Sequence, residues 1–186
     1  TRDHGLWGGN INVAREVYQK ADGTLATRLD DRMSELLSRG SLYASKTVTD
    51  KEAIGTFDRT YVTYDFEVAN ASTGTKVSYV MKAGDKTYRV TAEQRNDGAY
   101  MSVSCREDKG HPVASQMRIG DTLVGKHSVR IVIDHSVCEF FLDDQYSLTA
   151  RTSLFGGAYT ASVETGTATV SNLSVNKLAH CGDVYD

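Results

Sequence analysis

Alternation of apolar and polar residues, repeated along most of the chain, is the feature that most limits what this sequence can fold into. Thr60 to Val68 alternates over nine residues, with Thr60, Val62, Tyr64, Phe66 and Val68 on one face. A period of two places these side chains on the same side of a β-strand, with one face of the strand buried. The pattern therefore predicts β-sheet structure with one covered face.

Similar segments recur at short intervals. Turn signals such as Asn96-Asp97-Gly98 separate them. Asp30 to Ser38 alone has apolar residues at helical spacing, with Gly40 as a stop. The other segments expected as strands are 11–18, 25–29, 76–81, 86–94, 99–105, 129–133, 137–142, 146–154, 159–163 and 167–175. About a dozen strands and at most one short helix predict an all-β fold, a two-sheet antiparallel β-sandwich of the jelly-roll or concanavalin A-like kind.

Composition is consistent with one sandwich domain over residues 1–186. The chain has 21 Lys and Arg against 24 Asp and Glu, a net charge of -3, and its single proline, Pro112, leaves no Pro-rich linker. This balance argues against nucleic acid and anionic membranes as partners. No apolar run approaches the length of a membrane span.

Cys105 and Cys138 lie in strand patterns and are expected as small core residues. A disulfide that involves Cys181 stays open.

Two blocks carry a family resemblance. The first is Asp134-His135-Ser136-x-x-Glu139-x-Phe141-x-x-Asp144, followed by Leu148-Thr149-x-Arg151. The second, near the start, is Trp7-Gly8-Gly9, then Ala14-Arg15-Glu16 and Asp22-Gly23-x-Leu25. Together they resemble the C-terminal β-sandwich module of glycoside hydrolase family 32, the β-fructosidases of invertase, inulinase and levanase type, although Ala14 replaces the usual Pro. Residues 39–126 add length without a matching motif.

The resemblance implies a fragment that follows a missing catalytic propeller. Family 32 enzymes hold their nucleophile, acid/base and stabilising carboxylates in that propeller, and no Asn-Asp-Pro, Arg-Asp-Pro or Glu-Cys sequence occurs here. We therefore expect no catalysis from this chain alone and no cofactor. The implied parent acts on sucrose, levan or inulin and is secreted or periplasmic. Its sandwich packs on and supports the propeller; an isolated sandwich with that interface exposed is expected to form a homodimer.

Two other function classes compete with this interpretation. A stand-alone lectin-like carbohydrate-binding module is the alternative, because ten tyrosines offer rigid rings with hydroxyl groups. Tyr61, Tyr79 and Tyr88 are candidates to line a sheet surface and bind sugar, as is Trp7 by stacking. An enzyme in its own right would need an acidic pair in a concave site, and the sequence establishes none.

The motif residues also have structural interpretations. Asp134, His135 and Ser136 have the composition of a hydrolytic triad, but adjacent strand residues point to opposite faces, so a turn role for Asp134 and Ser136 is favoured. Glu139 either belongs to this structural motif or pairs with Asp134.

Arg15 and Glu16 likewise face opposite ways, and one of them is expected to form an ion pair with the propeller, with Trp7 at the same interface. The acidic pairs Asp30-Asp31 and Asp143-Asp144 supply too few oxygens for calcium, so the sequence predicts turns and no metal site.

Overall fold

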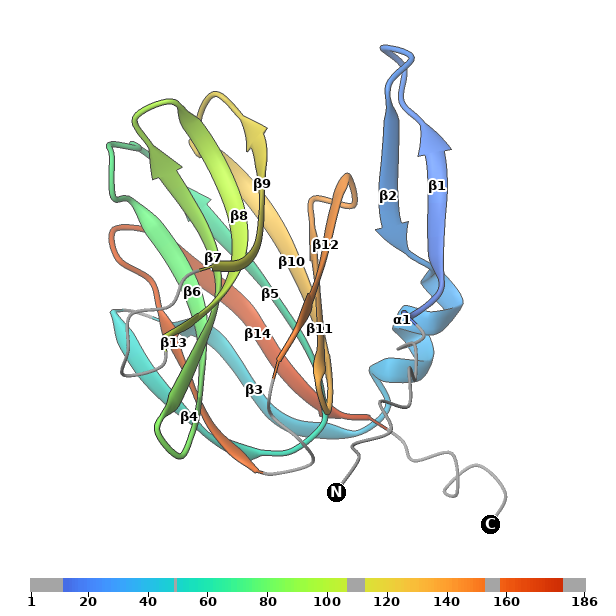
Figure 1. The fold of residues 1–186 in the computed structure, drawn as a ribbon, viewed down its shortest axis with the longest axis vertical. Coiled ribbons are helices and arrows are strands. Elements are labelled where there is room, and N and C mark those ends of the chain that lie inside the picture. Colours follow the sequence, from blue (N-terminus) through green and yellow to red (C-terminus); the bar gives the residue numbers. More distant parts are fainter. Residues whose placement is uncertain (1–11, 49, 107–112, 153–157, 179–186) are drawn as a thin grey trace, which may run out of the picture.

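The fold is seen in a computed structural model that describes residues 12–48, 50–106, 113–152 and 158–178. Two six-stranded sheets face one another, and a separate two-stranded hairpin followed by one helix lies beside them (Figure 1). Every strand pair is antiparallel. The predicted two-sheet β-sandwich with one short helix is confirmed. Within the described residues, no helix combines the length and apolar character that a membrane crossing requires.

We call the sheet beside the hairpin sheet I and the other sheet II. Sheet I has the order β12 (Tyr146–Arg151), β11 (Val137–Leu142), β10 (Gly125–Asp134), β5 (Thr60–Val68), β14 (Thr169–Lys177) and β3 (Ser41–Val48). Sheet II has the order β4 (Lys51–Phe57), β13 (Tyr159–Glu164), β6 (Lys76–Ala83), β7 (Lys86–Arg95), β8 (Gly98–Arg106) and β9 (Val113–Gly120).

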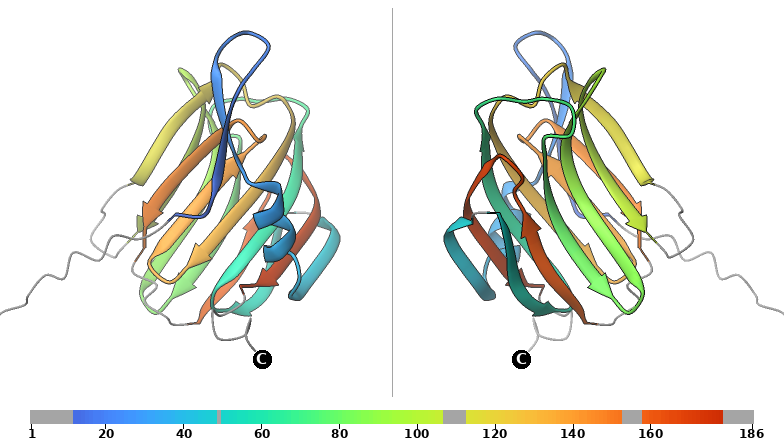
Figure 2. Two further views of the ribbon diagram at one scale, coloured as in Figure 1. Left: turned by 90° about the vertical axis from the view of Figure 1, so that its right-hand side faces the viewer. Right: turned by 90° about the vertical axis from the view of Figure 1, so that its left-hand side faces the viewer.

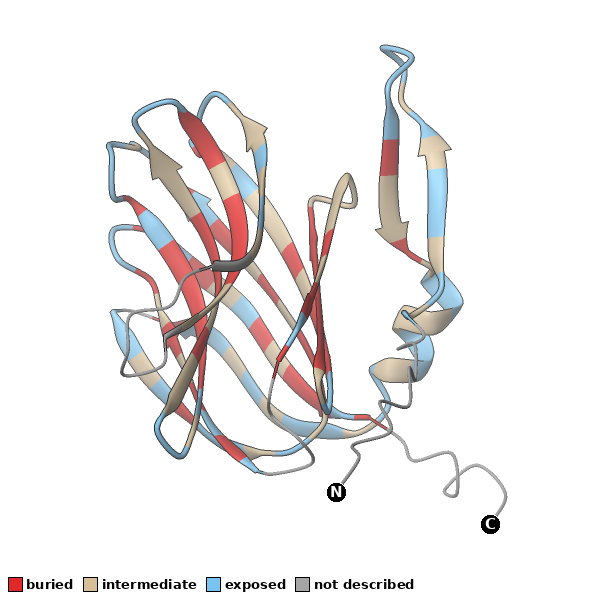
Figure 3. Cartoon of the chain, viewed as in Figure 1, coloured by how far each residue is buried: buried red, intermediate tan, exposed pale blue. Residues whose placement is uncertain are grey.

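The main core lies between the two sheets, and its buried residues come from the strands of both (Figure 3). Val62, Tyr64, Phe66 and Val68 all belong to it, which confirms the face predicted from the alternation of β5. Cys138 is fully buried in this core, as expected, whereas Cys105 is only partly buried and packs against the edge of the core. Burial of the thiol, with a smaller contribution from the Glu139 charge, raises the pKa of Cys138 to about 12.

A second apolar layer covers part of the outer face of sheet I. The hairpin of β1 (Arg15–Gln19) and β2 (Leu25–Leu29), together with α1 (Asp31–Leu37), lies across this face (Figure 2). Leu29, from the hairpin, packs on Tyr61, Val132 and Phe141 of the sheet, and Met33 of α1 joins them. Strand β11 consequently has an apolar layer on both sides, and all six of its residues are buried.

Helix α1 begins where the sequence predicts it. The Asp30 carboxylate accepts the backbone N–H groups of Arg32 and Met33 at 3.0 and 3.1 Å, so it caps the helix start. Asp143 and Asp144 form the β11–β12 turn, as predicted; their φ angles are 57° and 53°. Strands β3, β4 and β9 were not predicted. All three are edge strands, where one-sided exposure weakens the alternation that reveals inner strands.

Candidate functional site

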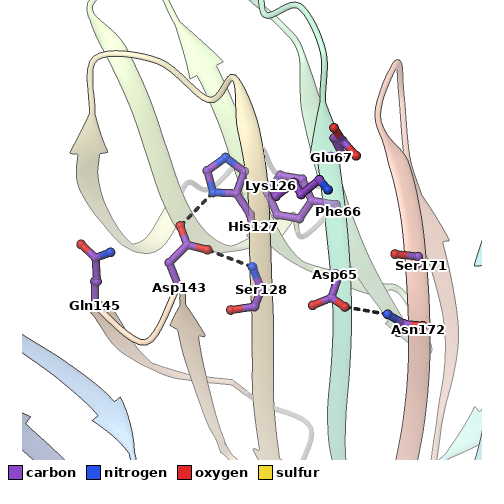
Figure 4. A pocket seen from close by; sticks show the side chains of 10 residues that line it. All are labelled: Asp65, Phe66, Glu67, Lys126, His127, Ser128, Asp143, Gln145, Ser171 and Asn172. Atoms are coloured by element: carbon purple, nitrogen blue, oxygen red, sulfur yellow. Dashed lines mark hydrogen bonds and ion pairs between the residues drawn. The ribbon is translucent and has the colours of Figure 1, made fainter.

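A depression of about 660 Å³ opens on the outer face of sheet I, at the end where β10 begins and β5 ends (Figure 4). It lies between the β11–β12 turn on one side and β14 on the other. The lining residues are Asp65, Phe66, Glu67, Lys126, His127, Ser128, Asp143, Gln145, Ser171 and Asn172.

The polar row of the depression follows from strand alternation. Because Phe66 and Val129 face the core, their neighbours Asp65, Glu67 and Ser128 face outward. The antiparallel register then sets Ser128 opposite Asp65, and Lys126 opposite Glu67. Two carboxylates, an ammonium group and a hydroxyl thus share one patch of two strands.

The β11–β12 turn forms one wall. Gln145 N–H donates to Leu142 O at 3.1 Å, closing a β-turn whose two central residues, Asp143 and Asp144, both have positive φ. The Asp143 carboxylate fastens this turn to β10: one oxygen accepts the Ser128 backbone N–H at 2.9 Å and the other lies 2.8 Å from His127 Nδ1. The wall is therefore held by side-chain bonds as well as by strand pairing.

His127 sits behind this wall, stacked on Phe66 with ring centroids 4.7 Å apart. Its Nε2 lies 3.1 Å from the carbonyl oxygen of Leu123, so both ring nitrogens face acceptors. Burial disfavours the charged ring, but the hydrogen bond and charge of Asp143 and the Leu123 carbonyl outweigh it, and the pKa of His127 is raised. The imidazolium form, which has two donors, satisfies both acceptors at once.

An irregularity in β14 forms the opposite wall. The register with β5 shifts between Ser171 and Ser174, and Asn172 has a φ of 54°. Its side-chain amide donates to one oxygen of Asp65 at 2.8 Å, which orients that carboxylate. The shift also brings the side chain of Ser171 to the rim.

The hairpin of β1 and β2 fixes the turn from outside. Thr27 N–H donates to Gln145 O at 3.1 Å, and the Tyr18 hydroxyl donates to Asp144 O at 2.8 Å. Arg130 holds the Asp144 carboxylate from the sheet at 2.6 Å. These bonds make the wall of the depression part of the contact between hairpin and sandwich.

The open groups of the depression are mixed donors and acceptors. Lys126 and Glu67 are exposed, and within the described residues they form no ion pair although they lie opposite each other. The second oxygen of Asp65 and the hydroxyls of Ser128 and Ser171 add acceptors and donors. Such a surface can hydrogen-bond a ligand that carries several hydroxyl groups. Phe66 is 1% exposed and offers no stacking face.

The predicted interface residues are paired within the chain. Arg15 forms an ion pair with Glu139 of β11, which is buried, and also donates to Ser147 Oγ at 3.1 Å. Glu16 pairs instead with Arg28 across the hairpin. The ion pair of Arg15 therefore joins the hairpin to the sandwich. Trp7 lies outside the described residues.

The Asp134 to Ser136 segment is the turn between β10 and β11, as predicted. Its geometry differs in detail from an Asx-type turn, because the Asp134 carboxylate contacts His135 Nδ1 at 2.7 Å and Arg59 at 3.7 Å. Ser136 contributes its carbonyl oxygen, which accepts Thr152 N–H at 2.6 Å. Glu139 lies opposite Val132 in the register and pairs with Arg15, so the alternative Asp134–Glu139 pair is wrong.

The tyrosine candidates for sugar binding are wrong as surface residues. Tyr61 and Tyr79 are 0% exposed and Tyr88 is 2% exposed. Tyr79 and Tyr88 belong to the core between the sheets. Tyr61 does lie on the opposite face of β5, as predicted, but the hairpin and α1 cover it, and its hydroxyl is 2.8 Å from Ser34 Oγ. The alternation of β5 predicted the face on which Tyr61 lies, but it could not show that a second layer covers this face.

Sequence reasoning missed the depression. Asp65 and Glu67 were visible as the polar positions of the β5 alternation, and Asp143 as part of a turn. Nothing in the sequence links these to Asn172, which lies more than a hundred positions from Asp65 and reaches it only through the β5–β14 pairing.

No family model matches the sequence, and no curated protein sequence matches it. The fold does match solved structures. Carbohydrate-binding module CBM66 from Bacillus subtilis aligns over 88% of this chain and 92% of its own, with a TM-score of 0.53 and 14% identity. A GH32 β-fructofuranosidase from Bombyx mori aligns over 91% of this chain, with a TM-score of 0.61 and 15% identity. The chain spans 33% of that enzyme. Lactose- and MES-liganded congerin II aligns over 68% of this chain and 100% of its own, at a TM-score of 0.53 and 13% identity.

Proposed function

We propose that this chain is a carbohydrate-binding β-sandwich and that its ligand, a neutral saccharide, lies in the depression on sheet I. The observation that carries the proposal is the patch formed by Asp65, Glu67, Lys126 and Ser128 between two braced walls. Sugar hydroxyls both donate and accept hydrogen bonds, so they match a surface that mixes carboxylate, ammonium and hydroxyl groups. The similar solved structures support it, since they include a protein named a carbohydrate-binding module and one bound to lactose.

Binding fits the depression better than catalysis does. Asp65 and Glu67 form an acidic pair on one face of β5, as a glycoside hydrolase would need. A general acid, however, needs a desolvated carboxyl group, and Glu67 is exposed while Asp65 is held by the Asn172 amide. The pair therefore serves as a set of hydrogen-bond acceptors.

Isothermal titration calorimetry with levan- and inulin-type fructo-oligosaccharides and with lactose tests the proposal. Saturable binding by the wild type and a loss of about tenfold or more in affinity for Asp65→Asn and Lys126→Gln are expected. Glu93→Gln, which removes a carboxylate from β7 in the other sheet, is the matched control and should bind as the wild type does. No heat at millimolar ligand, or equal affinity in all variants, would refute the proposal.

A second role rests on two exposed apolar side chains of the hairpin. Val17 and Leu25 are 61% and 72% exposed, and their register places them on one face of the hairpin. Apolar side chains clustered at a surface often mark a contact with another domain. We propose that this face packs on the catalytic propeller of a secreted or periplasmic family 32-type parent, and that the isolated chain forms a homodimer through it.

Sedimentation velocity over a range of concentrations tests the second role. The isolated wild type should self-associate, and Val17→Ser with Leu25→Ser should keep it monomeric. Leu42→Ser, a change of another exposed apolar residue on β3, is the control and should leave association intact. A wild type that stays monomeric at all concentrations, or a double variant that still associates, would count against this face.

A further inference from the structure

A second depression, of about 620 Å³, lies at the opposite end of β5 and β10. Its lining includes Phe57, Asp58 and Arg59 just before β5, His135 in the β10–β11 turn, and Lys177 at the end of β14. Strand β5 has nine residues. At about 3.3 Å per residue, the two depressions are therefore roughly 25 Å apart along the strands. They are separate sites.

Arg59 is the residue that sets the chemistry of this second depression. Its side chain is 15% exposed, yet its guanidinium donates no hydrogen bond to any described residue. The nearest charged group, Asp134 Oδ1, is 3.7 Å away, which is longer than a hydrogen bond. A guanidinium has five N–H donors in a planar fork, so a largely buried one without hydrogen-bond partners is ready to accept a planar anion.

The surrounding charges leave this fork open. Asp134 is engaged at short range by His135 Nδ1, at 2.7 Å, rather than by Arg59. Lys177 adds a second cation, which is exposed, and Asp58 is the one carboxylate among the lining residues. The backbone of Arg59 is fixed, because its carbonyl oxygen accepts Leu178 N–H at 3.1 Å.

Apolar side chains complete the second depression. The ring of Phe57 packs edge-on against Tyr159, with centroids 6.4 Å apart and an interplanar angle of 63°, which holds it in place. Leu42, 48% exposed, lies in the same lining. A held ring beside an exposed aliphatic group suits the C–H face of a sugar ring.

We propose that this depression binds an acidic saccharide, with the carboxylate of a uronic acid residue on Arg59 and Lys177 and the sugar ring against Phe57. The first depression, which sets the carboxylates of Asp65 and Glu67 against the single ammonium group of Lys126, is less favourable for the same carboxylate. The inference does not depend on the first site, because the two share no lining residue.

Isothermal titration calorimetry with trigalacturonate, and with neutral galactotriose for comparison, tests the proposal. We expect saturable binding of trigalacturonate that weakens as salt is raised, and none of galactotriose at this site. Arg59→Gln should weaken trigalacturonate binding about ten- to hundredfold, because it removes a charge-assisted bidentate contact. Lys177→Gln should weaken it about threefold, as expected for an exposed cation.

Two further measurements locate the site and keep the result decisive. Backbone amide shifts near Phe57 and His135 should move on titration, which holds as a test even if Arg59→Gln fails to fold. Asp65→Asn is the matched variant of the first depression and should bind trigalacturonate as the wild type does, even where it loses neutral sugars. The absence of binding, binding that Arg59→Gln leaves unchanged in a folded protein, or shifts confined to the first depression would overturn the proposal.

Discussion

The contact between Arg15 and Glu139 should be one of the most costly in the chain to break. Glu139 is a carboxylate within a strand that is buried on both sides, and its own side chain is 3% exposed. Arg15 neutralises it, and Val13 N–H donates to its other oxygen at 2.7 Å. Through these bonds the hairpin is attached to β11.

The expected loss in the free energy of unfolding depends on which charged or polar group each substitution leaves without a partner. Arg15→Met removes the cation and leaves a buried carboxylate without its counter-charge, which typically costs about 3 to 5 kcal/mol. Because the Arg15 side chain is 22% exposed, water can partly replace it, so we expect a loss of about 3 kcal/mol in the free energy of unfolding. Glu139→Gln keeps an acceptor for Val13 N–H and should cost about 1 to 2 kcal/mol.

Urea unfolding of Arg15→Met, of Glu139→Gln and of the double variant measures these losses in the free energy of unfolding. The double variant should lose at least about 1 kcal/mol less than the sum of the single losses, since the neutral amide introduced by Glu139→Gln has no need of the cation. Glu16→Gln breaks the exposed pair with Arg28 on the same hairpin and should leave the urea midpoint unchanged. Additive losses, or a cost below about 1 kcal/mol for Arg15→Met, would refute the reasoning.

Three other predictions test separate parts of the fold. Since the pKa of His127 is raised on folding, protonation stabilises the native state fully below the unfolded value near 6.5 and less as pH rises through the folded pKa. Stability measured between about pH 6 and pH 9 should fall accordingly, and His127→Gln should remove that slope; an unchanged slope would contradict the assignment. Gly98→Ala should cost about 2 kcal/mol in thermal unfolding, because φ is 145° and a Cβ would lie 2.6 Å from Gly120 O; full stability would show that the turn relaxes. The buried Cys138 thiol, with its pKa raised to about 12, should resist iodoacetamide at about pH 8 until the chain is unfolded, as mass spectrometry would show; rapid labelling of the native protein would refute its burial.

Local sequence patterns predicted those parts of the fold that depend on neighbours along the chain. The bounds of β5, the short helix after Asp30 and the turn at Asp143-Asp144 were all predicted, although the cap by Asp30 was not. Each depends on side-chain alternation or on the chemistry of a few adjacent residues. Edge strands such as β3 were not predicted, because their greater exposure weakens the alternation of apolar and polar residues.

The parts that depend on contacts between distant segments needed the structure. The alternation of β5 puts Tyr61 and Asp65 on the same outer face, and only the placement of the hairpin buries the first and leaves the second in an open depression. Asp65 gains its partner Asn172 through a register shift in β14.

By itself, the sequence determined an antiparallel sandwich and the core-facing side of β5, because side-chain alternation repeats every two residues. Tertiary structure alone decided which outward face is covered, that Arg15 pairs with Glu139 inside the domain, and that Arg59 lies in a depression without a hydrogen-bond partner among the described residues. Those outcomes depend on how separate layers pack in three dimensions, and the periodicity of the sequence carries no information about that packing.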